Sequence, residues 1–188
     1  MKVSQQIVGV NQRLGNTAVP NMQGTTRMIY DTAAITSATA TDQVFTFFSG
    51  VSSRTYPATN LSSNRFEVGE SLAIQGFSFA TFTTATTNLS NTLSQQLAIR
   101  GGILNFYIGN QRIIKDLEIC TYSRFGIGEA VSEGSECTVF RLETPIVIPP
   151  QIEYYATLRL SARSALNGNT LLLAAFGTGT LLNTKSTF

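Results

Sequence analysis

Two apolar segments joined by a Gly-Asn pair constrain the fold of this chain most, in the stretch ILNFYIGNQRIIKDLEI at residues 103–119. A two-residue turn that begins with Gly109 suits a type II′ β-hairpin, because glycine adopts the positive φ needed there. Closing the hairpin at this turn sets Phe106 opposite Ile113. One face then carries Leu104, Phe106, Ile108, Ile113, Leu117 and Ile119, and the other carries Asn105, Tyr107, Arg112, Asp116 and Glu118. This alternation predicts an antiparallel sheet with one buried face.

Further segments have the alternation or composition of strands, and turn residues separate them. They cover residues 43–48, 71–84, 139–148, 151–160 and 170–176. The segment 151–160 alternates, with Ile152, Tyr154, Ala156, Leu158 and Leu160 sharing the inward parity. The segment 170–176 is apolar on both faces, which predicts a central or interface strand. About seven to nine strands without a long helix predict an all-β sandwich or barrel.

The alternation is broken within the strand expected over residues 71–84. Leu72 and Ile74 have one parity, whereas Phe77 and Phe79 have the opposite one. A β-bulge at Gly76 would return all four side chains to the buried face.

Residues 1–43 differ in composition from the rest of the chain. They are rich in Asn, Gln, Thr and Ala, and they include DTAAITSATATDQ, which has almost no large apolar side chain. Such a segment buries too little apolar surface to fold alone. We therefore expect an extended N-terminal arm over residues 1–43, in which residues 25–30 can add an edge strand. A β-sandwich domain over residues 44–188 would follow.

The chain contains no histidine. This removes the usual general base, the commonest metal ligand and every Ser-His or Cys-His pair. The sequence also lacks a nucleophile elbow and a complete dinucleotide-binding glycine motif. We therefore expect neither enzyme activity nor a catalytic residue, and no cofactor or metal.

The remaining reactive side chains have plainer interpretations. Glu129, Glu133 and Glu136 share one segment, but their spacing fits a solvated turn rather than an EF-hand. Glu67 and Glu70 flank the start of a strand and are expected at the surface. Two cysteines, Cys120 and Cys137, are expected to remain reduced.

The surface is expected to carry little charge. Charged residues make up 13% of the chain, against roughly 25% in ordinary soluble domains. A net charge of +2 is too small to indicate a nucleic-acid partner. The sequence has no apolar run of transmembrane length and no signal-peptide core, so synthesis in a cytosol is expected. A low-charge surface of this kind suits burial against other subunits.

Three segments resemble strands of viral jelly-roll capsid proteins, from which many tailless icosahedral bacteriophages build their shells. They are FYIGNQRIIKDLEI, PIVIPPQIEYYATLRL and NTLLLAAFGTGTLL, and the resemblance extends over residues 66–182. It implies a single jelly-roll β-sandwich, a location in the virion and partners that are other copies of the chain and other capsid proteins. It supplies no catalytic residues. A basic, genome-binding arm, common in some such coats, is missing here.

We therefore expect a capsid subunit, either a coat protein or a minor vertex or penton protein, that forms homo-oligomers through its sheet faces and its arm. Nine side chains are the candidates for subunit contacts: Val8, Val10, Leu14, Met28, Ile29, Tyr107, Tyr155, Leu171 and Leu173. The alternative is a binding module of the lectin or fibre-head type. Its loops, such as residues 49–65 or 126–136, would recognise a receptor or glycan.

Overall fold

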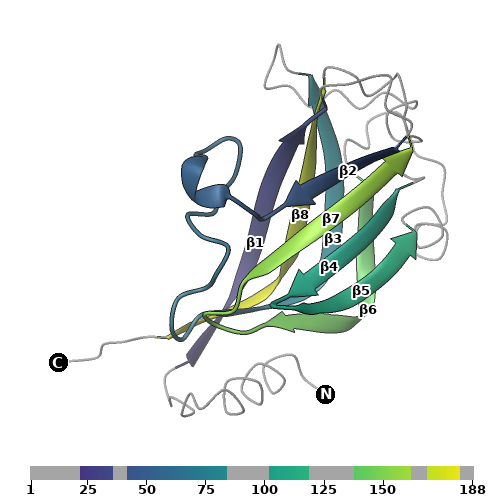
Figure 1. Cartoon of the computed structure of the whole chain (residues 1–188). Coiled ribbons are helices and arrows are strands. Elements are labelled where there is room, and N and C mark those ends of the chain that lie inside the picture. The colour runs from purple at the N-terminus through teal and green to yellow at the C-terminus, as the bar shows by residue number, and fades with distance from the viewer. Residues whose placement is uncertain (1–21, 36–41, 84–101, 119–137, 162–168, 183–188) are drawn as a thin grey trace.

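A computed structural model describes residues 22–35, 42–83, 102–118, 138–161 and 169–182. The described residues form eight strands and one short 3₁₀ turn (Figure 1). The strands are β1 Met22–Ala34, β2 Asp42–Phe47, β3 Ser71–Thr83, β4 Ile103–Ile108, β5 Gln111–Glu118, β6 Thr138–Ile148, β7 Tyr154–Ser161 and β8 Asn169–Leu182. The 3₁₀ turn, η1, spans Val51–Ser53 in the segment between β2 and β3.

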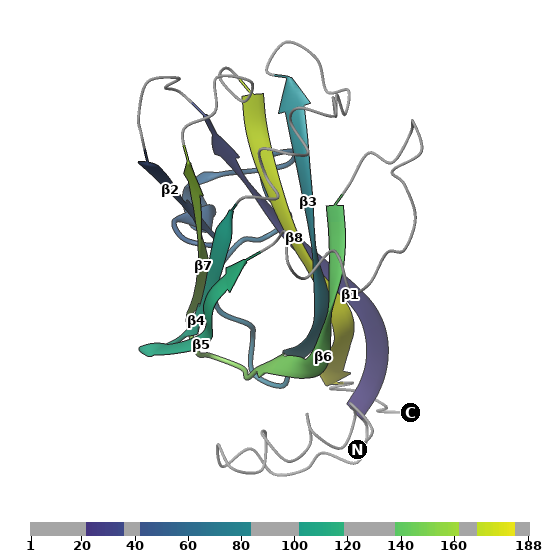
Figure 2. The same ribbon diagram turned by 90° about the vertical axis from the view of Figure 1, so that its right-hand side faces the viewer.

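The strands make two four-stranded antiparallel sheets that face each other as the layers of a sandwich (Figure 2). The first sheet has the order β1-β8-β3-β6, and the second has the order β2-β7-β4-β5. Strands that are neighbours in the chain often lie in opposite sheets, as β1 and β2 do. This jelly-roll-like order confirms the predicted all-β sandwich and decides between sandwich and barrel.

The core lies between the two sheets and is built from fully buried aliphatic and aromatic side chains. Phe77 of β3 meets Phe106 of β4 across the sandwich, with ring centroids 5.6 Å apart in a tilted arrangement. Tyr154 of β7 packs between Phe48 and Phe66, at 6.0 Å and 5.1 Å. Tilted pairs of this kind suit the ring quadrupoles and add to the gain from burial.

The predicted bulge in β3 is present. The register of β3 shifts between Ile74 and Gly76 against both neighbouring strands. The four apolar side chains that flank the shift, Leu72, Ile74, Phe77 and Phe79, are all at most 1% exposed. The extra residue in β3 therefore reverses the parity, as the sequence indicated.

A glycine in β8 lies against this bulge. Gly177 pairs with Ile74, and a Cβ at Gly177 would lie 1.9 Å from the carbonyl oxygen of Ala73. It would also lie 3.0 Å from the backbone nitrogen of Gln75. The bulged backbone approaches β8 so closely that a side chain has no room there.

The β4–β5 hairpin forms with its turn at Gly109 and Asn110, where Gly109 has φ +56°. Its register corrects one prediction, because Phe106 pairs with Ile114 and not with Ile113. Ile113 is 43% exposed and Ile114 is 9% exposed. Two register shifts in the hairpin move Ile114 to the core side. Asp116, which lies in the shift between Ile114 and Leu117, adopts φ +50°.

The last three strands follow the predicted pattern. Strand β6 ends at Ile148, directly before two prolines. In β7 the four residues Tyr154, Ala156, Leu158 and Leu160 are buried, whereas Ile152, predicted on the same face, precedes the strand and is only partly buried. Strand β8 pairs with β1 on one side and β3 on the other, which makes it a central strand.

Part of the predicted arm belongs to the sandwich. Strand β1 lies within residues 1–43, yet it pairs with β8 along its whole length from Met22 to Ala34. The edge strand expected over residues 25–30 is therefore confirmed and longer than expected. Residues 1–21 lie outside the described residues.

Candidate subunit interface

The candidate contact residues occupy different environments in the structure. Ile29, Leu171 and Leu173 are at most 1% exposed and belong to the core, so they are not available for subunit contacts. Met28, next to Ile29, points outward and is 52% exposed. The three candidates in the N-terminal segment, Val8, Val10 and Leu14, lie outside the described residues.

Tyr107 of β4 and Tyr155 of β7 form a stacked pair on the outer face of the second sheet. They are direct register partners, with ring centroids 4.5 Å apart and ring planes 5° apart. Each follows a fully buried neighbour, Phe106 or Tyr154, so both rings point away from the core. The structure thus brings together two candidates that are far apart in the sequence.

The neighbouring cross-strand pairs on this outer face combine apolar and polar side chains. Asn105 pairs with Thr157, and Ile103 pairs with Arg159. Val44 of β2, which is 62% exposed, lies opposite Arg159 on its other side. We call the surface formed by Tyr107, Tyr155, Asn105, Thr157 and Val44 the tyrosine face. Charged side chains border this surface, because Arg159 lies between Val44 and Ile103, and Arg112 pairs with Tyr107 and donates to Asn105. Aromatic side chains are enriched at the centre of protein interfaces.

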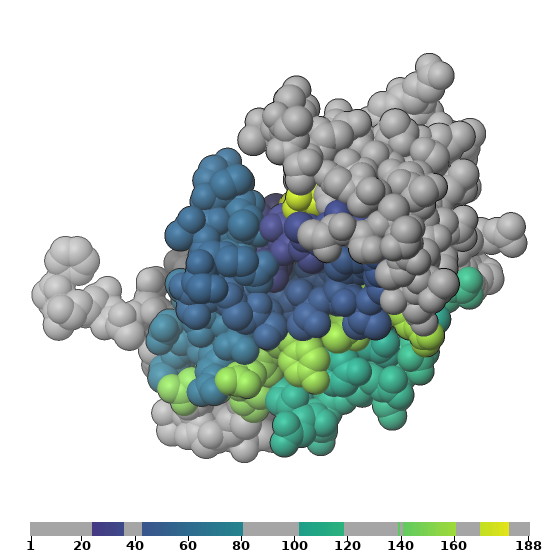
Figure 3. All heavy atoms as spheres, turned by 45° about the horizontal axis from the view of Figure 1, so that its top comes forward, coloured from purple at the N-terminus to yellow at the C-terminus, as the bar shows by residue number. Residues whose placement is uncertain are grey.

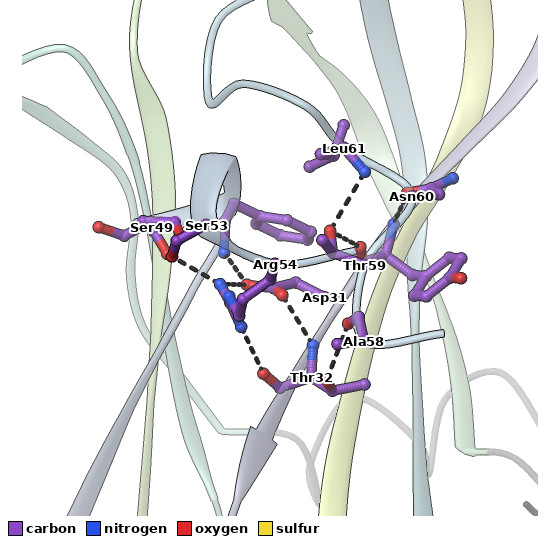
Figure 4. Close-up of polar contacts among 12 residues, drawn as sticks. Asp31, Thr32, Ser49, Ser53, Arg54, Ala58, Thr59, Asn60 and Leu61 are labelled. Atoms are coloured by element: carbon purple, nitrogen blue, oxygen red, sulfur yellow. Dashed lines mark hydrogen bonds and ion pairs between the residues drawn. The ribbon is translucent and has the colours of Figure 1, made fainter. Parts of the chain in front are cut away.

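A buried ion pair fastens the segment between β2 and β3 to strand β1 (Figure 4). The Asp31 carboxylate is fully buried, and its Oδ2 lies 2.8 Å from Nη2 of Arg54. The same Oδ2 accepts from the Phe48 N–H at 2.6 Å, and Oδ1 accepts from the Thr32 N–H at 2.9 Å. Arg54 also donates to the carbonyls of Thr32 and Ser49, both at 2.8 Å. Burial raises the pKa of Asp31, and the hydrogen bonds from Phe48 and Arg54 offset part of that rise.

Side chains of the same segment occupy the outer edge of β1. The Asn60 amide accepts from the Tyr30 N–H and donates to the Met28 carbonyl, both at 2.8 Å. The Thr59 hydroxyl donates to the Tyr30 carbonyl at 2.9 Å. With the bonds of Asp31 and Arg54 to the Thr32 backbone, these contacts satisfy the edge from the Met28 carbonyl to Thr32. Figure 1 shows the segment lying along this side of β1.

A second polar cluster lies near the start of β3. The guanidinium of Arg27 lies 4.5 Å from the ring centroid of Phe66 and 2.9 Å from the carboxylate of Glu70. Glu70 therefore has a cation as its partner, and Glu67 is exposed. Beneath Phe66, the Tyr154 hydroxyl is buried without a hydrogen-bond partner, and burial raises its pKa.

Sequence reasoning missed the buried ion pair because it treated residues 49–65 as a polar loop. One signal was present: Asp31 has the same parity as the buried Ile29, which places a carboxylate on a core face. Such a group needs a charged or hydrogen-bonding partner. The sequence does not show that the partner is Arg54.

Within the described ranges, no three His, Cys, Asp or Glu side chains gather into a potential metal site. No helix in this part of the chain is long and apolar enough to cross a membrane. Cys120, Cys137 and the Glu129–Glu136 segment lie outside the described residues.

Comparison with known proteins found no matching family model, no similar curated protein and no similar solved structure.

Proposed function

We propose that this chain is a structural virion protein, a capsid subunit that assembles with copies of itself and with other capsid proteins. The observation that carries the proposal is the jelly-roll-like strand order, β1-β8-β3-β6 facing β2-β7-β4-β5. This order matches the fold that the sequence resemblance implies. Fold alone does not define function, so the surfaces of the molecule provide the second line of support.

Two surface features suit repeated contact between subunits. The tyrosine face presents a preformed aromatic pair, and rigid aromatic side chains lose little conformational entropy when they bind. The exposed apolar side chains Met28 and Val44 lie on different sheets, so the molecule offers contacts on two sides. A closed shell requires each subunit to have several such contacts.

The decisive experiment is assembly of the purified full-length chain, followed by sedimentation and negative-stain electron microscopy. We expect closed shells, pentamers or larger rings whose yield falls for Tyr107→Ala combined with Tyr155→Ala. A chain that remains monomeric at every concentration, alone and with other capsid proteins, would contradict the proposal.

The arm is tested by deletion of residues 1–21, which leaves β1 in place. We expect this variant to fold, as measured by circular dichroism, and to form fewer particles than the full chain. A longer deletion to residue 40 is unsuitable, because it removes the 13-residue strand that pairs with β8. Particle formation equal to that of the full chain would exclude the arm from assembly.

A receptor- or glycan-binding module is the second candidate. The observation in its favour is Tyr56, which is 82% exposed on the segment that the Asp31–Arg54 pair fastens to β1. In the space-filling view, β2 and the segment between β2 and β3 form one surface with β7 and the β4–β5 hairpin (Figure 3). Glycan-array binding by a monomer, lost in Tyr56→Ala, would favour this function over assembly.

A further inference from the structure

The outward backbone groups of β1 divide into an occupied part and an open part. In an antiparallel strand, the N–H and C=O of one residue point to the same side, and successive residues alternate between the two sides. The loop contacts of Met28, Tyr30 and Thr32 show that even-numbered residues face away from β8. Because the register with β8 has no shift, Gly24 and Thr26 also direct their backbone groups outward.

The open part of the edge runs from Gly24 to the N–H of Met28. Among the described residues, no group bonds to the outward N–H of Gly24, Thr26 or Met28. One contact reaches an outward carbonyl, a long 3.4 Å bond from the Thr25 hydroxyl to Thr26. An open row of donors and acceptors can accept another strand.

The other edge strands are less suited to strand pairing. Strand β5 contains two register shifts, and Asp116 within it has φ +50°. Strand β6 pairs irregularly with β3 between Arg141 and Ile146, with Pro145 in this stretch. Strand β2 has six residues. Bulges, proline and short length are the usual means by which proteins protect sheet edges.

We propose that the Gly24–Met28 edge pairs antiparallel with the same edge of a second copy of this chain, across a two-fold axis at Thr26. Thr26 then faces the partner's Thr26, and Gly24 faces the partner's Met28. The inference rests on the proposed function, because it names one contact within the proposed assembly.

The segment is self-complementary in shape and charge. Met28 is 52% exposed, and no atom lies within 4 Å of the position that a Cβ at Gly24 would take. Each methionine would therefore enter the open space over the partner's glycine. The three outward residues are uncharged, and Arg27 is neutralised by Glu70. A two-fold contact juxtaposes equivalent surfaces, so this absence of net charge avoids like-charge repulsion.

The occupied part of the edge defines the register. One step further, Tyr30 would face the partner's Met22, but its N–H and C=O are already bonded to Asn60 and Thr59. The Met28 carbonyl also already accepts from Asn60, so Met28 joins the ladder through its N–H alone and the pairing ends there. The segment between β2 and β3 therefore sets the length of the contact. It also prevents the two strands from shifting toward Thr32.

A proline at the centre of the contact tests the proposal. Thr26→Pro removes an N–H that faces away from β8, so the ladder within the subunit retains its bonds. Thr26→Ala keeps the N–H and is the matched control. In analytical ultracentrifugation of the full chain, we expect Thr26→Pro to weaken self-association about tenfold or more and Thr26→Ala to leave it near wild type. Equal association of a folded Thr26→Pro variant would overturn the proposal.

Cysteine cross-linking gives a readout that does not depend on tolerance of proline. Facing residues of a hydrogen-bonded pair have Cα atoms about 5.5 Å apart, within the usual disulfide range of about 4.4–6.8 Å. Thr26→Cys should form dimers on oxidation, whereas Thr144→Cys, at an exposed position on β6 at the opposite edge of the same sheet, should not. Equal cross-linking of the two variants would overturn the proposal. Pairing of this edge with residues 1–21 of its own chain would also abolish the Thr26→Cys dimer.

The outcomes separate the contact from the function. Particles that form in a folded Thr26→Pro variant overturn the strand contact and leave the capsid proposal standing. Dimers that cross-link through Thr26→Cys without any larger particle support the contact and contradict the capsid proposal. A wild-type monomer at every concentration contradicts both.

Discussion

Asp31 and Arg54 form an ion pair in which the carboxylate is fully buried and the guanidinium is about one-third exposed, with 2.8 Å between Oδ2 and Nη2. The pair joins the first strand of the sandwich to the segment that follows the second strand. The same guanidinium bonds to two backbone carbonyls. One side chain therefore bonds three acceptors and holds this segment against β1, and its removal would leave a buried carboxylate without its cation.

We predict that Arg54→Met lowers the free energy of unfolding by on the order of 3 kcal/mol, because it leaves Asp31 buried and unpaired. Urea denaturation followed by circular dichroism measures this change. The matched control is Arg65→Met, whose ion pair with Glu153 has both side chains about half exposed. Exposed pairs contribute little, so the control should change stability by less than about 1 kcal/mol. Equal losses would show that Arg54 has no special role.

Protonation of Asp31 should contribute to the change of the free energy of unfolding with pH. Burial raises the pKa of its carboxyl in the folded state, so the folded protein binds the proton more tightly than the unfolded chain. The contribution of Asp31 to the free energy of unfolding is therefore complete below its pKa in the unfolded chain, about 3.9. This contribution is lost as pH rises through the higher pKa of Asp31 in the folded protein. The stability difference between wild type and Asp31→Asn should fall over this range. A difference that grows with pH would mean that Arg54 lowers the pKa more than burial raises it.

Neighbouring residues of β4 should respond differently to truncation. Phe106 is fully buried against Phe77, so Phe106→Ala should cost about 3–5 kcal/mol of stability. Tyr107→Ala removes a stacked ring from the outer face and should cost the subunit only about 1 kcal/mol. Chemical denaturation measures both changes, and particle yield should fall for Tyr107→Ala. Similar destabilisation by the two variants would show that both rings belong to the core.

Gly177→Ala should prevent normal packing of β8 against the bulge in β3. Its Cβ would lie 1.9 Å from a backbone oxygen, so a strand must move, and we expect a loss of roughly 4 kcal/mol or more. Gly24→Ala is the control, because its Cβ would meet no atom within 4 Å. The melting temperature of Gly24→Ala should stay close to that of the wild type. An unchanged melting temperature for Gly177→Ala would mean that the bulge adjusts without cost.

Tyr154→Phe should raise stability by about 1 kcal/mol, because it removes a buried hydroxyl that has no hydrogen-bond partner. The aromatic contacts with Phe48 and Phe66 are retained. Tyr155→Phe, on the outer face, is the control and should have little effect. A marked loss of stability in Tyr154→Phe would indicate that the hydroxyl makes a stabilising bond.

Local sequence pattern determined most of the strands, because the side chains of a strand alternate between two faces. The alternation of Tyr154, Ala156, Leu158 and Leu160 and the parity change around Gly76 could both be read without a structure. The hairpin turn was readable because glycine at its first position has a distinct conformational preference. The strand β1 was only partly recognised, because polar side chains such as Thr25, Arg27 and Asp31 occupy its inward positions and its burial depends on β8.

Tertiary structure decided the features that depend on distant partners. The shift that buries Ile114 in place of Ile113 is a property of pairing between strands, and the alternation along one strand does not reveal it. The stacking of Tyr107 on Tyr155 depends on the assignment of β4 and β7 to neighbouring positions in one sheet. The ion pair of Asp31 with Arg54 arises because the segment after β2 returns along β1. Sequence periodicity reports which residues face the core, whereas the choice of partner is set by how the whole chain packs.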